Sequence, residues 1–309
     1  MGGTGFIGRN MTNYFSNLPN YDVTATHFES PTFNDETISW LQVDLRDPHQ
    51  VEEAITNFDI VIQAAATTSG IKDAVSRPDY HVTDNAVMNS LVFRRASQAK
   101  VKHLIFFSCT TMLQSSESPQ IEDDFNANDE VYSRYFGVGW TKVYLEKMCE
   151  FFSRHSETKF TVIRHSNVYG PWDKYDLEKS HVFGATITKV LLATDSIEIW
   201  GDGSEKRDLL YITDLVEFVK KALDNQKDKF RIYNCGGNVL VSTRELTERI
   251  MSIAERNLEI HFNTDKPTVK FSVCLDNKRA KDELGWSPRV ELDMGIRLSL
   301  DFWKEHIKS

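Results

Sequence analysis

The sequence predicts an α/β protein with a doubly wound parallel sheet and a smaller C-terminal lobe. Two observations predict this fold. Short β-rich runs alternate with amphipathic helical stretches through the first half of the chain, and a glycine-rich segment opens it. Strands that alternate with helices usually form a parallel sheet that helices cover on both faces. A chain of 309 residues has room for such a domain and a companion lobe.

The first element is a glycine loop, which reads Gly2-Gly3-Thr4-Gly5-Phe6-Ile7-Gly8. Gly2, Gly5 and Gly8 have the spacing of a turn that binds a pyrophosphate and enters a helix, because side chains there would keep the backbone away from the phosphates. The loop therefore predicts a Rossmann sheet. Such a loop normally follows a central buried strand, and only Met1 precedes it here. We therefore expect the native protein to carry further residues upstream.

The remaining elements follow in order along the chain. The β-rich runs expected as strands are Asp22–Thr26, Ile38–Val43, Ile60–Ala64, His103–Ser108 and Phe160–Arg164. Helical patterns lie between them, for example at His49–Asn57 and Thr83–Gln98. The rhythm breaks after Gly170. We therefore expect a dinucleotide-binding domain at 1–168 and a smaller lobe at 169–309, from which segments such as Ser196–Trp200 return to the main sheet.

Composition excludes several classes of protein. A formal net charge of −9 disfavours nucleic-acid binding, because there is no basic patch to meet phosphates. The four cysteines are far apart, which indicates neither a disulfide framework nor a metal site and fits a reducing cytoplasm; they are Cys109, Cys149, Cys235 and Cys274. No apolar run approaches the length of about 18 residues that a membrane span needs, and no signal peptide opens the chain. We expect a cytoplasmic protein with no membrane partner.

Further motifs occur in a characteristic order after the glycine loop. They are Asp44-Leu45, Ala64-Ala65-Ala66, Asn85, Ser108-Cys109-Thr110, Gly139–Lys142, Asn167-Val168-Tyr169-Gly170-Pro171, Arg207-Asp208 with Asp214, and Leu284-Gly285-Trp286-Ser287-Pro288. Together they resemble the extended short-chain dehydrogenase/reductase family, in particular its NAD-dependent epimerase/dehydratase group, which acts on nucleotide sugars. The resemblance covers essentially the whole chain. It implies that residues 169–309 mainly bind the substrate.

The resemblance also implies which residues hold the cofactor. They are Gly2, Gly5, Phe6, Ile7, Gly8, Asp44, Leu45, Ala64, Ala65, Ala66 and Lys142. An Asp or Glu about 20 residues beyond the glycines would bind the adenosine ribose of NAD, but no acid stands cleanly at that strand end. No arginine cluster offers itself to the 2′-phosphate of NADP, and Arg9 is the nearest arginine. We expect NAD, with NADP as the alternative.

On the substrate side, the resemblance implies that Thr110, Asn167, His181 and Arg207 contact the nucleotide sugar, where Thr110 would hold the sugar oxygen and Arg207 the diphosphate. The segment Ser180-His181-Val182 resembles the GDP-fucose synthase branch, in which the matching His acts as an acid. In this chain His181 is expected either to donate a proton or to cap the next helix. We expect a GDP-linked substrate.

One residue departs from the family pattern. The catalytic Tyr of the family stands four residues before the Lys, and in this chain Val138 occupies that position. Three explanations remain open. Tyr135 could reach inward, although Gly137 and Gly139 argue against a continuous helix there. Proton transfer could be slow or water-assisted, with Thr110 holding the hydroxyl. Finally, the protein could be a catalytically inactive, dinucleotide-binding regulatory relative.

The sequence thus predicts an NAD(P)-dependent oxidoreductase or epimerase that acts at C4 of a nucleotide-linked sugar. Its predicted catalytic residues are Thr110, Lys142, His181 and Tyr135. Dehydration is not expected, because Thr111 and Met112 stand where a dehydratase carries Asp-Glu. The resemblance also implies a homodimer formed through the helix that carries Lys142. Apolar positions that would support this interface are Val143, Leu145, Met148 and Phe151, most of which are expected in the core.

Overall fold

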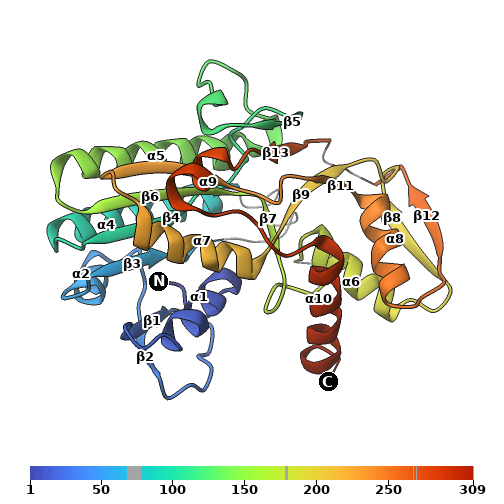
Figure 1. The fold of residues 1–309 in the computed structure, drawn as a ribbon, viewed down its shortest axis with the longest axis horizontal. Coiled ribbons are helices and arrows are strands. Elements are labelled where there is room, and N and C mark those ends of the chain that lie inside the picture. The colour runs from blue at the N-terminus through green and yellow to red at the C-terminus, as the bar shows by residue number, and fades with distance from the viewer. Residues whose placement is uncertain (68–77, 178–179, 267, 269, 309) are drawn as a thin grey trace.

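The centre of the molecule is a four-stranded parallel sheet. The computed structural model describes residues 1–67, 78–177, 180–266, 268 and 270–308 (Figure 1). The strands of the central sheet lie in the order β10-β6-β4-β3, with β3 at Ile60–Gln63, β4 at His103–Phe107, β6 at Lys159–His165 and β10 at Phe230–Cys235. All five residues of β4 are buried, as expected for a parallel strand covered on both faces.

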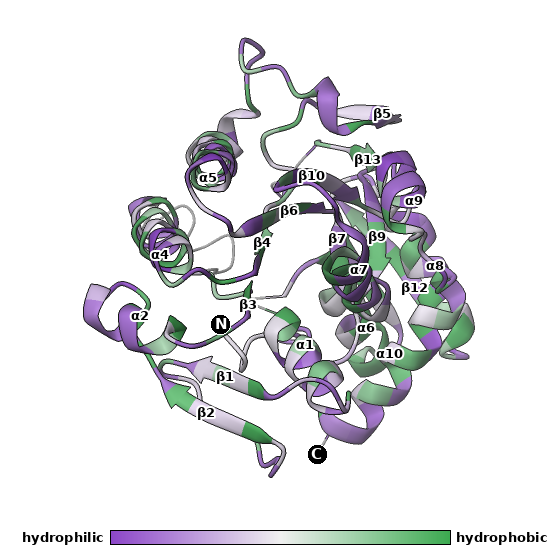
Figure 2. Ribbon diagram, turned by 60° about the vertical axis from the view of Figure 1, so that its left-hand side comes forward, coloured by the Kyte–Doolittle hydropathy of each residue, from purple (hydrophilic) through white to green (hydrophobic). Residues whose placement is uncertain are grey.

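Helices pack on both faces of this sheet (Figure 2). On one face lie α2 (Pro48–Ile55), α4 (Pro78–Gln98) and α5 (Phe136–His155). On the other lie α1 (Phe6–Ser16), α7 (Ile212–Asn225) and α9 (Lys278–Leu284). This is the doubly wound Rossmann arrangement that the sequence predicts.

A second parallel pair continues the sheet beyond β3. It consists of β1 (Val23–His27) and β2 (Ile38–Gln42). Residues 1–3 lie between β1 and β3 and bond to both sides. The amino group of Met1 donates to the carbonyl of Ile62 at 2.8 Å, and the amide of Gly3 donates to the carbonyl of Thr26 at 2.7 Å. Among the described residues, no other segment joins β1 to β3 by backbone hydrogen bonds.

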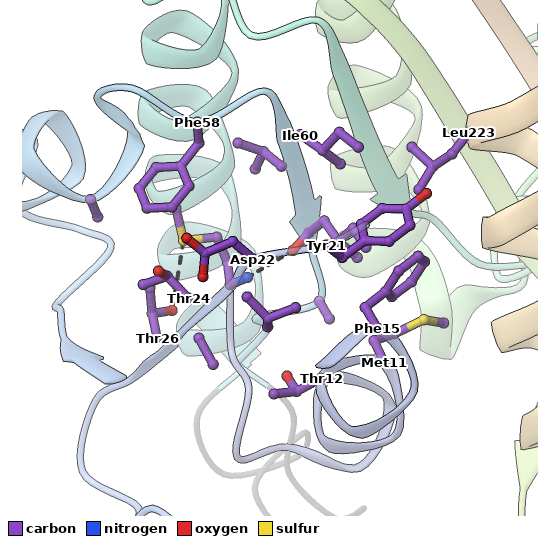
Figure 3. A pocket seen from close by; sticks show the side chains of 18 residues that line it. Met11, Thr12, Phe15, Tyr21, Asp22, Thr24, Thr26, Phe58, Ile60 and Leu223 are labelled. Atoms are coloured by element: carbon purple, nitrogen blue, oxygen red, sulfur yellow. Dashed lines mark hydrogen bonds between the residues drawn. The ribbon is translucent and has the colours of Figure 1, made fainter. Parts of the chain in front are cut away.

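A cavity of about 120 Å³ opens behind Met1 in this space (Figure 3). Its lining reaches from Thr26 near the carboxyl end of β1 to Asp22 and Ile60 near the amino ends of β1 and β3, with Met11 and Phe15 of α1 beside them. The cavity therefore lies within the layer of the sheet. Ligands of open α/β sheets bind outside the carboxyl ends of the strands, so we do not place the substrate in this cavity.

Each of the five runs that the sequence predicts as strands forms a strand, with ends that differ by one residue. The two predicted helices correspond to α2 and α4, and α4 begins earlier than expected, at Pro78. One expectation was wrong. Ser196–Trp200 forms β8, which pairs with β12 (Glu259–Asn263) and does not join the main sheet. The burial of β8 alternates along the strand, which suits a sheet with one solvated face, and the segment that returns to the main sheet is β10.

The C-terminal half contributes most of a second lobe (Figure 1). Its helices are α6 (Val182–Leu192), α8 (Thr243–Ile253) and α10 (Leu292–His306). Besides β8 with β12, the small sheets join β7 (Asn167–Tyr169), β9 (Lys206–Tyr211) and β11 (Leu240–Ser242), and pair β5 (Ser116–Gln120) with β13 (Val273–Leu275). Two short 3-10 helices span Glu122–Asp124 and Ser133–Tyr135.

The two lobes share one apolar core and meet beside α1. Buried residues of α1, α7 and α10 belong to a single hydrophobic cluster. The side-chain amide of Asn10 donates to the carbonyl of Pro171 at 2.9 Å. The guanidinium of Arg9 lies 3.2 Å from the ring centre of Trp172 and 4.4 Å from that of Phe33. Within the described ranges, no helix is both long and apolar enough to span a membrane.

Candidate active site

The glycine loop forms a turn in which the backbone approaches itself closely. Gly2 has a φ of +70°, and a Cβ there would lie 2.7 Å from the Cα of Ala65. A Cβ on Gly8 would lie 2.0 Å from the carbonyl oxygen of Gly2. The loop leads into α1, whose N-cap Gly5 offers no side-chain acceptor to the first turn. The amides of that turn are therefore available to an anion, and the loop fits a dinucleotide pyrophosphate. Phe6 and Ile7 are the first residues of this helix.

Ala64, Ala65 and Ala66 follow β3 directly and run beside the glycine loop. The amide of Ala64 donates to the carbonyl of Met1 at 3.3 Å. The next residue, Thr67, is held at both backbone groups by the side chain of Asn85, with two hydrogen bonds of 3.0 Å. The three alanines thus lie at the carboxyl edge of the sheet, where the resemblance expects them to line the cofactor.

Asp44 and Leu45 follow β2. The carboxylate of Asp44 accepts two hydrogen bonds of 2.9 Å from Arg46, which holds its pKa below the usual range. Arg46 also bonds Asp84 at 3.0 Å. Leu45 is buried in the core beside α2. At the end of β1, where many NAD-binding sheets carry an acid, the structure has His27, whose Nδ1 lies 3.1 Å from the carbonyl of Ser30.

Lys142 lies within α5, which runs unbroken from Phe136 to His155. The expectation that Gly137 and Gly139 would interrupt this helix was wrong. Both glycines serve close packing: a Cβ on Gly137 would lie 2.8 Å from Val82, and one on Gly139 would lie 3.1 Å from the carbonyl of Thr111. Val138 therefore stands one helical turn before Lys142 on the same face, as the family spacing requires.

The ammonium of Lys142 donates to the carbonyl of Phe107 at 2.8 Å and lies 4.8 Å from the ring centre of Phe106. Burial lowers the pKa of Lys142, while nearby Cys109 and Glu146 oppose that change. Lys142 thus reaches the carboxyl end of β4. Thr110 lies just beyond that end, and within the described chain its hydroxyl has no hydrogen-bond partner. The neighbouring Cys109 has its Sγ 2.9 Å from Oγ1 of Thr111.

Tyr135 lies directly before α5 and packs against the apolar cluster that includes Phe271 and Val273 of the segment around β13. Its ring packs against Phe271 and Tyr132, with ring centres 5.2 and 5.6 Å away. Burial raises the pKa of Tyr135, and Arg207 opposes this effect. A phenol of raised pKa keeps its proton at neutral pH, so Tyr135 suits hydrogen-bond donation better than general-base chemistry.

The remaining predicted substrate residues lie on the second lobe. Asn167 is exposed at the start of β7, and its amide donates to the carbonyl of Asp208 at 3.1 Å. Arg207 donates to the carbonyls of Lys206 and Phe271 at 2.8 and 3.1 Å. His181 is the N-cap of α6 but accepts no capping hydrogen bond through its side chain. Desolvation and the charge of Lys174 lower the pKa of His181.

Sequence reasoning missed His165, the last residue of β6. Its ring centre lies 6.2 Å from that of Phe107, and its Nδ1 is 2.8 Å from the carbonyl of Ser166. Burial, together with the charges of Lys142 and His181, lowers its pKa to about 4, although the hydrogen bond to Ser166 opposes this change. His165 belongs to no spaced motif. The signal that could have revealed it is its position at the carboxyl end of a central strand.

A buried polar network lies beneath the site. Arg164 and Glu146 form an ion pair at 2.7 Å, and the hydroxyl of Ser108 donates to Glu146 at 2.6 Å. Glu146 follows Lys142 by one turn of α5, and Arg164 precedes His165. The network therefore joins α5, β4 and β6 at their functional ends. Among the residues that the structure describes, no cluster of three or more His, Cys, Asp or Glu side chains could hold a metal ion.

Comparisons with known proteins find relatives that match over nearly the whole chain. The GDP-L-colitose synthase of Yersinia pseudotuberculosis is 24% identical over 309 residues, which cover 98% of this chain and 96% of that protein. The GDP-L-fucose synthase of Azorhizobium caulinodans is 26% identical over 314 residues, with 98% and 94% covered. The structure of UDP-glucose 4-epimerase from Thermotoga maritima with UDP-glucose matches with a TM-score of 0.87 at 23% identity, covering 99% of this chain and 98% of that one.

A second solved structure, the UDP-glucose 4-epimerase of Thermus thermophilus in complex with NAD, matches with a TM-score of 0.84 at 22% identity, covering 99% and 98% of the two chains. These likenesses show that the fold is shared. The model of the NAD dependent epimerase/dehydratase family matches residues 1–236, which is well over half of the chain. The chain therefore belongs to the NAD-dependent epimerase/dehydratase family.

Proposed function

We propose that this protein is an NAD-dependent oxidoreductase or epimerase that acts at C4 of a GDP-linked sugar. The observation that carries the proposal is the convergence of two features at one edge of the sheet. A glycine loop there leaves the amides of α1 open to a pyrophosphate, and Lys142 reaches the end of β4, the strand after which Thr110 follows; within the described residues the Thr110 hydroxyl has no hydrogen-bond partner. GDP is proposed because relatives that match over nearly the whole chain are named synthases of GDP-linked sugars.

In this proposal, the glycine loop, Ala64–Ala66 and Asp44 with Leu45 hold the dinucleotide. A bound nicotinamide supplies a hydride acceptor or donor at the sugar carbon. Lys142 binds the nicotinamide ribose, and Thr110 holds the sugar oxygen. NAD is favoured over NADP because the arginines near the adenosine end are already engaged: Arg46 bonds Asp44 and Asp84, and Arg9 stacks between Phe33 and Trp172.

On the substrate side, Arg207 provides a guanidinium that can bond two phosphate oxygens at once. Its charge acts on Tyr135, so the two side chains lie on the same wall of the site. Asn167 and His181 are exposed at the starts of β7 and α6, where they can contact the sugar nucleotide. In this arrangement His181 is a candidate acid, and Tyr135 is a candidate hydrogen-bond donor to the substrate.

The alternative is a catalytically inactive relative that binds a dinucleotide and regulates another process. Val138 is the observation that favours it, because a valine cannot move a proton. Two measurements separate the proposals. Calorimetry with NAD and NADP reports binding, and incubation with GDP-mannose and UDP-glucose, followed at 340 nm and by product mass, reports turnover. Binding with turnover supports the enzyme, binding without any product supports the regulatory relative, and failure to bind either dinucleotide refutes both.

We also propose that the protein is a cytoplasmic homodimer. All four cysteines are free thiols, as a reducing compartment allows. Exposed apolar side chains on α4 and α5 support a helical dimer interface: Val87, Tyr144 and Phe151. Of the positions that the sequence suggested, Leu145 is buried in the core and Phe151 is exposed. Light scattering on Phe151→Asp tests the interface, since a monomer is expected if α5 forms it.

A further inference from the structure

Proton transfer at this site lacks its usual residue. The position one turn before Lys142 on α5 is Val138, which has no group that can accept or release a proton. Oxidation of an alcohol removes the hydroxyl proton together with the hydride of the carbon. A side chain of another element that reaches the same edge of the sheet can supply the missing proton acceptor.

β6 brings a side chain to this place. β4 and β6 are neighbours, and the amide of Ser108 donates to the carbonyl of Ile163 at 2.8 Å, so β4 ends beside the last residues of β6. His165 is the final residue of β6, and its ring lies against that of Phe107. The carbonyl of Phe107 accepts the hydrogen bond of Lys142. Lys142 thus bonds the carbonyl of Phe107, while the ring of His165 contacts the ring of the same residue.

The hydrogen bond of His165 determines which ring nitrogen carries the proton. Nδ1 lies 2.8 Å from the backbone carbonyl of Ser166, and a carbonyl can only accept. Nδ1 must therefore be protonated, which leaves the lone pair of Nε2 available as an acceptor. The lowered pKa of His165 keeps the ring neutral at pH 7. Lys142 on α5 and His181 before α6 are the charged or titratable groups that act on it.

Other groups near Lys142 are less suited to accept this proton. The pKa of Tyr135 is raised, so its phenol stays protonated at neutral pH. The thiol of Cys109 already has a polar partner in the hydroxyl of Thr111 at 2.9 Å. His181 stands on the second lobe, at the start of α6. Among the described residues near Lys142, His165 combines a place at the end of a central strand with an acceptor nitrogen that has no hydrogen-bond partner within the described chain.

We propose that Nε2 of His165 accepts the proton of the substrate hydroxyl, in place of the tyrosine to which Val138 corresponds; this inference rests on the proposed function. The O–H bond breaks and an N–H bond forms at Nε2, so that the imidazole becomes an imidazolium. The electron pair of the O–H bond becomes the second bond of the carbonyl as hydride leaves the carbon for the nicotinamide. In the reverse direction His165 returns the proton. The diphosphates of both ligands bring negative charge, which stabilises the imidazolium.

The test compares His165→Gln with wild type on whichever probe, GDP-mannose or UDP-glucose, the wild type converts. Glutamine keeps a side-chain donor for the carbonyl of Ser166 but cannot accept a proton. We expect turnover to fall by about 10²–10⁴-fold, with unchanged affinity for NAD in calorimetry. The double variant His165→Gln with Val138→Tyr should recover part of the activity, because the tyrosine restores a proton acceptor beside Lys142. His261→Gln, at an exposed histidine on β12, is the matched control.

A measurement without cofactor provides an independent readout. Nitrogen NMR of ¹⁵N-histidine-labelled, ligand-free protein should show His165 as the neutral Nδ1–H tautomer, with a pKa of about 4. The Nε2–H tautomer would overturn the proposal even if His165→Gln fails to fold. Equal turnover of His165→Gln and wild type would overturn it while leaving the proposed function intact. A parallel loss of NAD affinity would assign His165 a structural role, and a wild type without turnover would overturn both proposals.

Discussion

The buried ion pair beneath the site gives a sharp stability prediction. Glu146 and Arg164 lie 2.7 Å apart, and their side chains are only 4% and 3% exposed. Glu146→Gln has nearly the same size as the native residue, so it leaves no cavity, but it removes the charge that compensates Arg164. An uncompensated charge in the interior is much more costly than a lost surface ion pair.

The expected cost follows from this burial. Breaking a buried pair by changing one partner destabilises proteins by about 3–5 kcal/mol. The entropy of unfolding is roughly 2.1 cal/mol/K per residue, which for 309 residues gives about 0.65 kcal/mol/K. Glu146→Gln should therefore lower Tm by about 5–8 °C.

The same helix supplies a matched control. Glu150 also forms ion pairs, with Lys147 at 2.9 Å and with Arg154, but its partners are about 70% exposed. Glu150→Gln should cost less than about 1 kcal/mol. Urea unfolding and calorimetric scans of both variants and wild type compare the two losses. If Glu146→Gln is no more destabilising than Glu150→Gln, the reasoning about the buried network is wrong.

Three further changes have expected outcomes. Gly8→Ala places a Cβ 2.0 Å from the carbonyl oxygen of Gly2 and should abolish dinucleotide binding in calorimetry. The control is Gly285→Ala, at a φ of +67° with open space around it, which should lower the free energy of unfolding by about 1 kcal/mol and leave binding unchanged. Burial raises the pKa of Asp173 to about 7, so the contribution of Asp173 to stability should fall as pH rises from about 4 to 7. Relative to wild type, the free energy of unfolding of Asp173→Asn should rise by up to about 4 kcal/mol between these pH values and should not rise further above pH 7. If urea unfolding shows the same difference between the two proteins from pH 4 to 8, this prediction is contradicted. Lys142→Met should weaken NAD binding by about 10–150-fold. It should not lower Tm, because removing the ammonium also removes the free-energy cost of burying it. An unchanged Kd for NAD would refute the role of Lys142 at the ribose.

Much of the fold could be predicted from local patterns. Alternation of β-rich and helical runs located β1, β2, β3, β4 and β6 to within one residue, because each strand is a short run rich in residues that favour strands. The pattern could not assign β8 to its sheet. Polar and apolar residues already alternate along Ser196–Trp200 in the sequence, but the strand with which it pairs depends on tertiary contacts.

The site was predictable where residues form a spaced motif and unpredictable where the fold alone brings them together. The glycine loop and Lys142 belong to such motifs. His165 is a lone histidine at the end of a buried strand, and the pairing of β6 with β4 brings its ring to Phe107, whose carbonyl Lys142 bonds. The glycines of α5 misled the sequence reading for a related reason. The free-energy cost of placing glycine within a helix is offset by close packing against Val82 and the carbonyl of Thr111. Propensities read from the local sequence do not include such packing.

The contacts of Trp172 connect α1 with the C-terminal helix. This residue adopts a left-handed backbone conformation with a φ of 70°. Its ring stacks on the guanidinium of Arg9 in α1 and also contacts the rings of Phe302 and His306 in α10. If the dinucleotide and the sugar nucleotide bind as proposed, order imposed on the start of α1 would reach the second lobe through these contacts of Trp172. Thermodynamic reciprocity would then require the sugar nucleotide to tighten dinucleotide binding by the same factor.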